Sequence, residues 1–441
     1  MGDKVEVSEK DVETTRLSKR QIDEENERLE KELGGTKMSV MLVDQPDRSI
    51  NIGVVGVGQA GSKIAENFYN LGYSTVVINT AMQDLKYINV PERQKLFLDV
   101  ALGGAAKDLE TGAAAVEEYA DQVLEMLEKN FEDSDVLMLV TSGGGGTGSG
   151  SAENMVKIMS QLDKPVVVIY VLGLSTEDAL SKHNCFQTLS KLARLAKGDL
   201  INSLMIVDNA KIELLYPGKS MAQFWKVANQ AIVEPLHLFN ELSANPSEYT
   251  SLDPMDFSRI LVGTSDCALY GMIEVEDYLE EDAIAEAVIA NMENGLLASE
   301  FDLSQTRSAG VIITGTKEML DQIPAANLEY GFAMVNKLCN DGTQIFRGVY
   351  TTPEQKGLRV YSLFSGLGLP EERVTELKTE AERHMNALQG KEDNRATNMT
   401  VDTGKTTAVS AADALHKKIK NKRNAMSKIK KNSKRIIDRR R

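Results

Sequence analysis

The sequence predicts an α/β fold: a parallel sheet covered by helices, a long central helix and a second domain of α+β type. Apolar runs such as Asp135–Val140 and Lys164–Leu172 are typical of strands buried on both faces of a parallel sheet. Glycine-rich segments follow two of the predicted strands and open helix-like segments, which is the alternation expected of such a sheet. Beyond about residue 260 the pattern changes to the strands and helices of a mixed module.

Composition restricts the class of protein. The chain has 441 residues, of which 42% are hydrophobic and 26% charged, as in globular proteins of two or three domains. No apolar run approaches a membrane span and the N-terminus lacks an apolar signal region, so we expect a soluble cytoplasmic protein. The three cysteines lie far apart and the four histidines show no metal-ligand spacing. This pattern favours free thiols and no metal held by the protein alone.

The net charge of −15 hides a strong asymmetry. Residues 416–441 contain thirteen Lys or Arg and a single acid, Asp438, so the rest of the chain is highly acidic. The acidic body should repel nucleic acid and anionic membranes. The basic end is the part with the charge to attract them.

A first glycine-rich loop follows the predicted strand Ile50–Gly56. Residues 56–61 form a literal G-x-G-x-x-G between a strand and a helix, which by itself indicates a Rossmann-like dinucleotide site. An NAD site also needs an acid at the end of the second strand, but Thr75–Ile78 ends in Asn79 and Thr80. An NAD(P)-dependent oxidoreductase is therefore the weaker interpretation, and contact with the phosphates of another nucleotide is favoured.

The strongest signal is the run Ser142–Gly150, which connects the strand Asp135–Val140 to a helix-like segment from Ser151. Successive glycines let backbone N–H groups approach a polyanion, and the helix start adds partial positive charge. A P-loop is excluded because no Lys occurs between residues 135 and 157. A flexible linker is disfavoured because strand and helix flank the run so tightly. We expect a phosphate chain to bind Gly143, Gly144, Gly145, Gly146, Thr147, Gly148 and Ser149.

Residues 144–150 match the G-G-G-T-G-[ST]-G signature of the tubulin/FtsZ superfamily of GTPases in both order and composition. The resemblance extends to about residues 50–367 and implies a GTP- and GDP-binding GTPase assisted by Mg²⁺. In relatives a further loop senses the γ-phosphate, and two of its FtsZ glycines are alanines here. The nucleotide-binding residues implied by these other loops are Gly58, Gln59, Ala60 and Gly61, then Asn79, then Gly103, Gly104, Ala105 and Ala106.

The resemblance also implies contacts to the ribose and base. Glu177 is a candidate ribose contact, with a helix-cap carboxylate as the alternative, and the FtsZ Arg four residues later is Ser181 here. Asn209 offers a donor and an acceptor to the base or sugar. On the central helix, an aromatic residue and an amide one turn apart are expected to stack on and read a purine, although the aromatic pair is alternatively core. These residues are Phe224, Trp225 and Asn229.

Two acids follow the central helix. Asp253 and Asp256 match the acids of the FtsZ catalytic loop, whose Asn is replaced by Ser251. In that family the loop enters the nucleotide site of the next subunit, where its acids polarise the attacking water. A second role, compatible with the first, is capping of a helix that begins at Pro254.

The predicted organisation follows the chain in six parts. They are a charged helical extension at 1–48, a GTP-binding domain at 49–219, a central helix at 220–245, an α+β GTPase-activating domain with the catalytic loop at 246–367, a C-terminal helix at 368–389, and a disordered tail with a basic end at 390–441. Within these parts we expect a helix at 113–130, strands at 259–262, 308–314 and 358–364, and helices at 283–298 and 329–339.

These observations imply a GTPase that polymerises head to tail into filaments, with hydrolysis completed by the adjacent subunit. The extension, the Asp208-Asn209 phrase and the basic tail resemble the plasmid and phage TubZ-like branch, which implies a role in moving or positioning DNA. The basic tail would then contact DNA or a DNA-bound adaptor. An FtsZ-type division GTPase is an alternative. Another is a nucleotide-binding regulatory protein that does not polymerise, which Ser251 and the alanines at 105 and 106 favour.

Overall fold

The computed structural model describes residues 48–398 except 101–102, 216–219, 295–300 and 354. The chain divides into two compact units, Met1–Met385 and Asn386–Arg441. The predicted helical extension, apart from Arg48, and the predicted basic end lie outside the described residues. No helix within the described ranges is long and apolar enough to cross a membrane.

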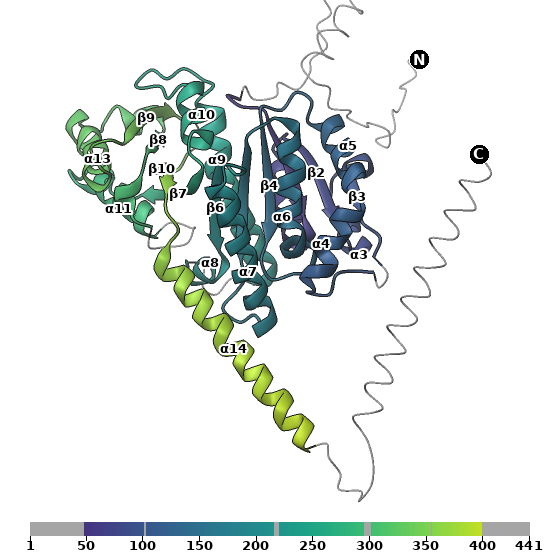
Figure 1. Ribbon diagram of the computed structural model, residues 1–441. Coiled ribbons are helices and arrows are strands. Elements are labelled where there is room, and N and C mark those ends of the chain that lie inside the picture. The colour runs from purple at the N-terminus through teal and green to yellow at the C-terminus, as the bar shows by residue number, and fades with distance from the viewer. Residues whose placement is uncertain (1–47, 101–102, 216–219, 295–300, 354, 399–441) are drawn as a thin grey trace, which may run out of the picture. The chain divides into compact units, whose positions relative to one another are not determined.

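A ten-stranded sheet runs through the first unit in the order β3-β2-β1-β4-β5-β6-β7-β10-β8-β9 (Figure 1). Neighbouring strands from β3 to β7 are parallel, β10 is antiparallel to β7 and β8, and β8 and β9 are parallel. The sheet therefore continues from the predicted nucleotide-binding half into the second. Its strands are Ile52–Val57 (β1), Ser74–Asn79 (β2), Lys95–Phe97 (β3), Val136–Ser142 (β4), Val166–Leu172 (β5), Ser203–Asp208 (β6), Asp266–Val275 (β7), Ser308–Gly315 (β8), Gln344–Thr351 (β9) and Leu358–Leu367 (β10).

Helices cover the sheet, and this confirms the predicted α/β class. Strands β1, β5 and β6 are buried along their whole length, as expected of parallel strands covered on both faces. The helices are Gly58–Asn70 (α2), Met82–Lys86 (α3), Leu109–Glu118 (α4), Ala120–Asn130 (α5), Thr147–Met159 (α6), Ala179–Lys197 (α7), Asn209–Leu215 (α8), Met221–Leu242 (α9), Pro254–Val262 (α10), Ala283–Asn294 (α11), Lys317–Leu320 (α12), Ala325–Leu338 (α13) and Glu371–Asn398 (α14).

Helix α9 is the predicted central helix. It begins at a capping box, in which the Ser220 side chain accepts a hydrogen bond from the Gln223 N–H and the Gln223 side chain accepts one from the Ser220 N–H. Its 22 residues span about 33 Å at 1.5 Å per residue. The helix starts after β6 and α8 and carries the chain to the opposite edge of the sheet, where α10 lies (Figure 1).

Three predicted elements are wrong in detail. The strand expected at 259–262 is the end of α10. Asp253 and Pro254 start this helix, and the apolar run at 259–262 is too short to form a strand against that helix-start signal. The helix expected at 113–130 is two helices, which meet at Tyr119. The tail was expected to be disordered from 390, but α14 extends to Asn398. Gly390 lies within α14, and one glycine costs a helix only about 1 kcal/mol.

Candidate functional site

The loops predicted to bind nucleotide gather along one edge of the sheet. Strands β2, β1, β4, β5 and β6 are parallel neighbours. Their carboxyl ends therefore meet at the same edge, which is where ligands bind in open α/β sheets. The loops at 58–61, 79–81, 143–149, 173–177 and 208–209 all begin there.

The first loop closes against the loop at 143–149, which we call the signature loop. Gly58 has a φ of +75°, and a Cβ placed on it would lie 3.0 Å from the backbone nitrogen of Gly148. A Cβ on Gly61 would collide with the carbonyl oxygen of Val140. These two positions therefore require glycine, because the two backbone segments touch. Gly145 differs, since a Cβ there would meet no atom within 4 Å, which leaves this part of the signature loop open to a ligand.

The signature loop is fixed by hydroxyl groups at the start of α6. The Oγ1 atoms of Thr147 and Thr80 are 2.6 Å apart and buried, which joins the signature loop to the end of β2. Ser149 Oγ donates to the carbonyl oxygen of Ser142 over 2.9 Å. Helix α6 begins at Thr147, four residues before the predicted start, and no side chain caps it. Its first N–H groups are thus suited to an anion.

Asp84 lies among the predicted nucleotide contacts, although the sequence pattern does not indicate it. The Asn79 side chain donates to Asp84 Oδ2 over 3.2 Å, and Gln59 Nε2 lies 3.3 Å from Asp84 Oδ1. Asn79 Oδ1 also accepts from the Ala81 N–H. One carboxylate thereby orients two predicted nucleotide contacts from different loops. Asp84 follows Asn79 by five positions, and nothing in the sequence around it indicates this pairing.

The loop at 103–108, which we call the third loop, has unusual backbone geometry. Gly103 and Gly104 have φ values of +71° and +153°, and the next turn places Ala106 at +46° and Lys107 at +64°. Left-handed non-glycine residues cost about 1–3 kcal/mol each and cluster at functional sites. A Cβ on Gly146 would lie 2.8 Å from Ala105 Cβ and 2.9 Å from the Lys107 nitrogen. The third loop therefore packs directly against the signature loop.

Lys107 and Asp178 form an ion pair that links the third loop to α7. Asp178 also caps α7 by accepting from the Ser181 N–H over 3.0 Å. The pKa of Asp178 is lowered to about 2, chiefly by the hydrogen bond from Lys107 and next by the one from the Ser181 N–H. The buried Asn184 donates to the Lys107 carbonyl oxygen over 2.8 Å. Helix α7 thus holds both the side chain and the backbone of Lys107.

Glu177 lies against the signature loop. Its Oε1 accepts from the Leu174 N–H over 3.3 Å, and its carboxylate occupies the space where a Cβ of Gly144 or Gly173 would stand. The cap of α7 is Asp178 and not Glu177. The alternative interpretation of Glu177 as a helix cap is therefore excluded by this geometry.

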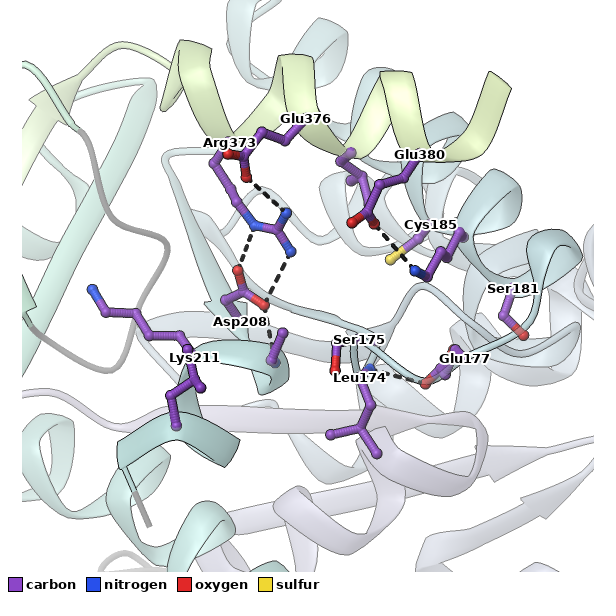
Figure 2. Close-up of a pocket in the computed structure, with 15 residues that line it drawn as sticks. Leu174, Ser175, Glu177, Ser181, Cys185, Asp208, Lys211, Arg373, Glu376 and Glu380 are labelled. Atoms are coloured by element: carbon purple, nitrogen blue, oxygen red, sulfur yellow. Dashed lines mark hydrogen bonds and ion pairs between the residues drawn. The ribbon is translucent and has the colours of Figure 1, made fainter. Parts of the chain in front are cut away.

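Asp208 and Asn209 end β6 and begin α8, and both are buried. Arg373 of α14 donates from Nε to Asp208 Oδ2 over 2.6 Å, and Asp208 Oδ1 accepts from the Ala210 N–H over 3.1 Å. The pair lines a cavity of about 340 Å³, and Figure 2 shows Glu177 across this cavity from it. Lys182, which also lines the cavity, forms an ion pair with Glu380 over 3.3 Å. Arg373 lies on the C-terminal helix, far in sequence from the glycine loops, so the sequence pattern does not connect it with this site.

The aromatic pair lies in the first turns of α9. The rings of Phe224 and Trp225 meet edge to face, with centroids 5.1 Å apart. Phe224 packs against the core, while Trp225 and Asn229 are half-buried on the helix. The core interpretation thus applies to Phe224, and contact of Trp225 and Asn229 with a base stays a prediction.

Asp253 and Asp256 cap α10 reciprocally. Asp253 Oδ1 accepts from the Asp256 N–H over 2.8 Å, and Asp256 Oδ2 accepts from the Asp253 N–H over 3.3 Å. Burial raises the pKa of Asp256, and the hydrogen bond that Asp256 accepts from the Asp253 N–H offsets part of this rise. In Figure 1, α10 lies at the top of the sheet and α8 and α3 at the bottom, next to the nucleotide loops. The structure therefore does not bring these acids together with the glycine loops of the same chain.

A metal site built by the protein alone is not present among the described residues, which contain no cluster of three His, Cys, Asp or Glu able to hold an ion. Mg²⁺ bound with nucleotides commonly uses one or two carboxylates together with phosphate oxygens. Asp84 supplies one such carboxylate beside the loops. This donor set fits an ion that arrives with a nucleotide.

Comparisons with known proteins identify relatives of this chain. Residues 51–216 match the model of the tubulin/FtsZ family GTPase domain, and residues 239–378 match the model of the C-terminal domain of TubZ-like proteins. The tubulin-like protein CetZ of Pyrococcus horikoshii is 28% identical over 71% of this chain and 85% of its own length. The cell division protein FtsZ of Methanothermobacter thermautotrophicus is 26% identical over 74% of this chain and 84% of its own.

Solved structures share the fold. The TubZ protofilament of Bacillus thuringiensis serovar israelensis in its GTPγS form has a TM-score of 0.70 at 18% identity, over 80% of this chain and 96% of its own. CetZ2 of Haloferax volcanii has a TM-score of 0.62 at 23% identity, over 78% and 100%. Because both domain models belong to one family and occupy adjoining parts of a single sheet, the chain belongs to the tubulin/FtsZ family, with its GTPase domain and a TubZ-like C-terminal domain.

Proposed function

We propose that this GTPase binds GTP at the loop edge of its sheet and assembles head to tail, so that α10 of one copy completes the hydrolysis site of the next. One observation carries the proposal. The glycine loops and the two acids of α10 lie at opposite edges of the same molecule (Figure 1). One protomer then carries both the nucleotide loops and the catalytic acids, but too far apart to act together. Stacking two copies brings the acids of one to the loops of the other.

Such a contact is heterologous, because the loop edge of one copy meets the α10 edge of another. A heterologous contact that does not close into a ring produces filaments. TubZ and CetZ2, whose folds resemble this one, were both solved as nucleotide-bound protofilaments. The exposed Met255 of α10 and Leu214 of α8 add apolar surface at the two edges.

In this proposal the loops at 58–61, 79–81, 103–108 and 143–149 hold the phosphates of GTP through backbone N–H groups. Glu177 contacts the ribose, while Asn209, Trp225 and Asn229 lie around the base. Mg²⁺, when bound, neutralises charge on the phosphate oxygens during transfer. Asp253 and Asp256 of the neighbouring copy orient the attacking water and accept its proton.

The cellular role that we propose is the movement or positioning of plasmid or phage DNA within the cytoplasm. Support comes from the TubZ-like C-terminal domain and from the likeness to the type III plasmid segregation protein TubZ, at a TM-score of 0.66. The basic end at 416–441 would contact DNA or a DNA-bound adaptor. Deletion of 416–441 should weaken that binding and flatten its salt dependence, and an unchanged salt slope would count against a DNA-directed tail.

A cell-division role is the second candidate, and the 26% identity with FtsZ over 74% of the chain favours it. The two roles differ in what loss of the protein does. Loss of a segregation filament lowers the retention of a resident plasmid or phage genome and leaves cell length unchanged. Loss of a division filament lengthens cells whether or not such an element is present.

Sedimentation with GTP, GDP and GTPγS, together with phosphate release at rising protein concentration, tests the biochemical proposal. We expect a pellet with the triphosphates and a specific activity that climbs above a threshold concentration. Specific activity independent of concentration, without a pellet, would leave a nucleotide-binding regulatory protein as the better description.

A further inference from the structure

The loop that leads to the two acids of α10 is fastened to the edge of the sheet. It spans residues 243–253, between α9 and α10, and we call it the acid loop. Strand β9 is the last strand in the sheet order. The N–H of its Val349 donates to the Thr250 carbonyl oxygen over 2.8 Å, and these two residues form an antiparallel bridge. The Ser247 hydroxyl group donates to the carbonyl oxygen of Val349. The acid loop is therefore held by β9, in the half of the chain beyond the central helix.

Tyr350, the next residue of β9, holds the residue that precedes Asp253. Its hydroxyl group accepts a hydrogen bond from the Leu252 N–H over 2.8 Å and donates one to the Leu252 carbonyl oxygen over 3.1 Å. Both residues are buried. The Tyr350 ring lies against Gly348, where a Cβ would stand 2.5 Å from the ring carbon Cε2. One hydroxyl group thus satisfies both backbone groups of Leu252, and glycine at 348 gives the ring the room that it occupies.

The peptide unit between Leu252 and Asp253 connects this hydroxyl group with the second acid. A trans peptide unit is planar, so its carbonyl oxygen and its N–H point in opposite directions. The carbonyl oxygen of this unit accepts from Tyr350, and its N–H, which is that of Asp253, donates to Asp256 Oδ2 over 3.3 Å. Turning the peptide plane would break both hydrogen bonds. The Tyr350 hydroxyl group therefore acts on the direction of the Asp256 carboxylate through one rigid unit.

We propose that Tyr350 is a positioning residue for hydrolysis, whose hydroxyl group holds the Leu252–Asp253 peptide so that the Asp256 carboxylate faces the nucleotide of the neighbouring copy. This inference rests on the proposed function, in which that carboxylate orients the attacking water. A displacement of about 1 Å in a reacting group can lower a rate about a hundredfold. Because Tyr350 lies in the copy that supplies the acids, loss of its hydroxyl group should slow hydrolysis without weakening the binding of GTP.

Tyr350→Phe removes the hydroxyl group and keeps the ring. We expect phosphate release per sedimented subunit, at saturating GTP, to fall about tenfold, the effect of one lost hydrogen bond. The affinity of dilute protein for fluorescent GTPγS should change less than about twofold. Tyr270→Phe is the matched control, because the buried Tyr270 hydroxyl group donates to the Ile232 carbonyl oxygen of α9 over 2.9 Å. Both variants lose a buried tyrosine hydroxyl group, so an effect of lower stability alone would appear in both.

A double variant with Asp256→Gln shows whether Tyr350 acts through the acid. Asp256→Gln removes the carboxylate and keeps the capping box, so the hydroxyl group of Tyr350 no longer has a carboxylate to orient. In this background Tyr350→Phe should lower phosphate release by less than about a further twofold, measured in a single turnover. A purely structural effect of Tyr350→Phe would instead multiply with that of Asp256→Gln.

Gly348→Ala provides a second variant if Tyr350→Phe does not fold. It keeps the hydroxyl group, but its Cβ would press on the Tyr350 ring and displace it. Phosphate release should again fall while the affinity for GTPγS is retained. Unchanged release per sedimented subunit in this variant would contradict the positioning role.

The outcomes separate this inference from the proposal on which it rests. Full phosphate release in Asp256→Gln would refute the proposed function of the acids. If Asp256→Gln loses that activity, but Tyr350→Phe releases phosphate as fast as Tyr270→Phe or keeps its full effect in the double variant, the positioning role of Tyr350 is refuted. The proposed function then stands.

Discussion

Arg373 of α14 binds Asp208 at the end of β6 through a 2.6 Å hydrogen bond between two side chains that are only 16% and 5% exposed. The pair joins residues 165 positions apart. It ties the C-terminal helix to the residue that precedes the predicted base contact Asn209. Helix α14 is thereby part of the support of the proposed nucleotide site.

Arg373→Met should therefore destabilise the protein, because it leaves the Asp208 carboxylate buried without its cation. Breaking one partner of a buried ion pair costs about 3–5 kcal/mol. The free energy of unfolding, measured in urea, checks this value. Lys378→Met on the same helix is the control, since Lys378 and Glu382 are exposed and 4.0 Å apart. Equal stability of the two variants would contradict the role assigned to Arg373.

The acids of α10 allow catalysis to be separated from folding. Asp253→Ser keeps a good N-cap, and Asp256→Gln keeps the capping box, so each variant removes a carboxylate and retains the helix start. We expect both to bind GTP and form filaments with normal thermal stability, while phosphate release falls by about two orders of magnitude or more, as for loss of a general base. Undiminished turnover in both would show that these acids only cap the helix.

The sequence predicted those parts of the fold that local patterns determine. The strands β1, β4 and β5 are predicted because each is a continuous apolar run. The glycine loops are predicted because few other functions need such segments between a strand and a helix. Helix α10 was misread because its apolar residues, Ile260–Val262, are too few to separate strand from helix by period.

The rest depends on contacts between distant residues. The pairing of β6 with β7, which makes one sheet of two domains, joins positions more than sixty residues apart. The bridging of Gln59 and Asn79 by Asp84 arises because two loops meet at one edge. In both cases the residue types are ordinary, so composition and spacing carry no signal of the contact.

The signature loop provides a matched pair of glycine substitutions. A Cβ on Gly146 would press on Ala105 and Lys107 of the third loop, whereas one on Gly145 would meet nothing within 4 Å. Overpacking of this kind costs about 1–3 kcal/mol. Gly146→Ala should therefore lose GTP affinity about tenfold or more, as measured by fluorescent nucleotide binding. Gly145→Ala should keep the melting temperature of the unaltered protein, and a loss of stability there would contradict the open position of Gly145.

Acid should destabilise the junction of α9 with β2 through His237. The His237 Nδ1 lies 3.2 Å from the Tyr73 hydroxyl, and burial together with the nearby Arg48 charge lowers the pKa of His237 from 6.5 to about 4. Glu241, whose carboxylate is 3.2 Å from Nε2, opposes this shift. Because the folded state disfavours the charged ring, its stabilising contribution is complete above pH 6.5 and is lost as the pH falls towards 4.

The expected loss over this interval is about 3 kcal/mol, at 1.36 kcal/mol per pKa unit. Urea unfolding of the unaltered protein and of His237→Gln, repeated between pH 7 and pH 4, measures it, because Gln offers polar atoms to Tyr73 without titrating. The stability of His237→Gln should fall less steeply with acid than that of the unaltered protein. The carboxyl group of Asp178 does not confuse the result, since its pKa is lowered from 3.8 to about 2 and its contribution is lost only at lower pH. Parallel pH profiles for the two proteins would mean that Glu241 compensates fully for the burial of His237.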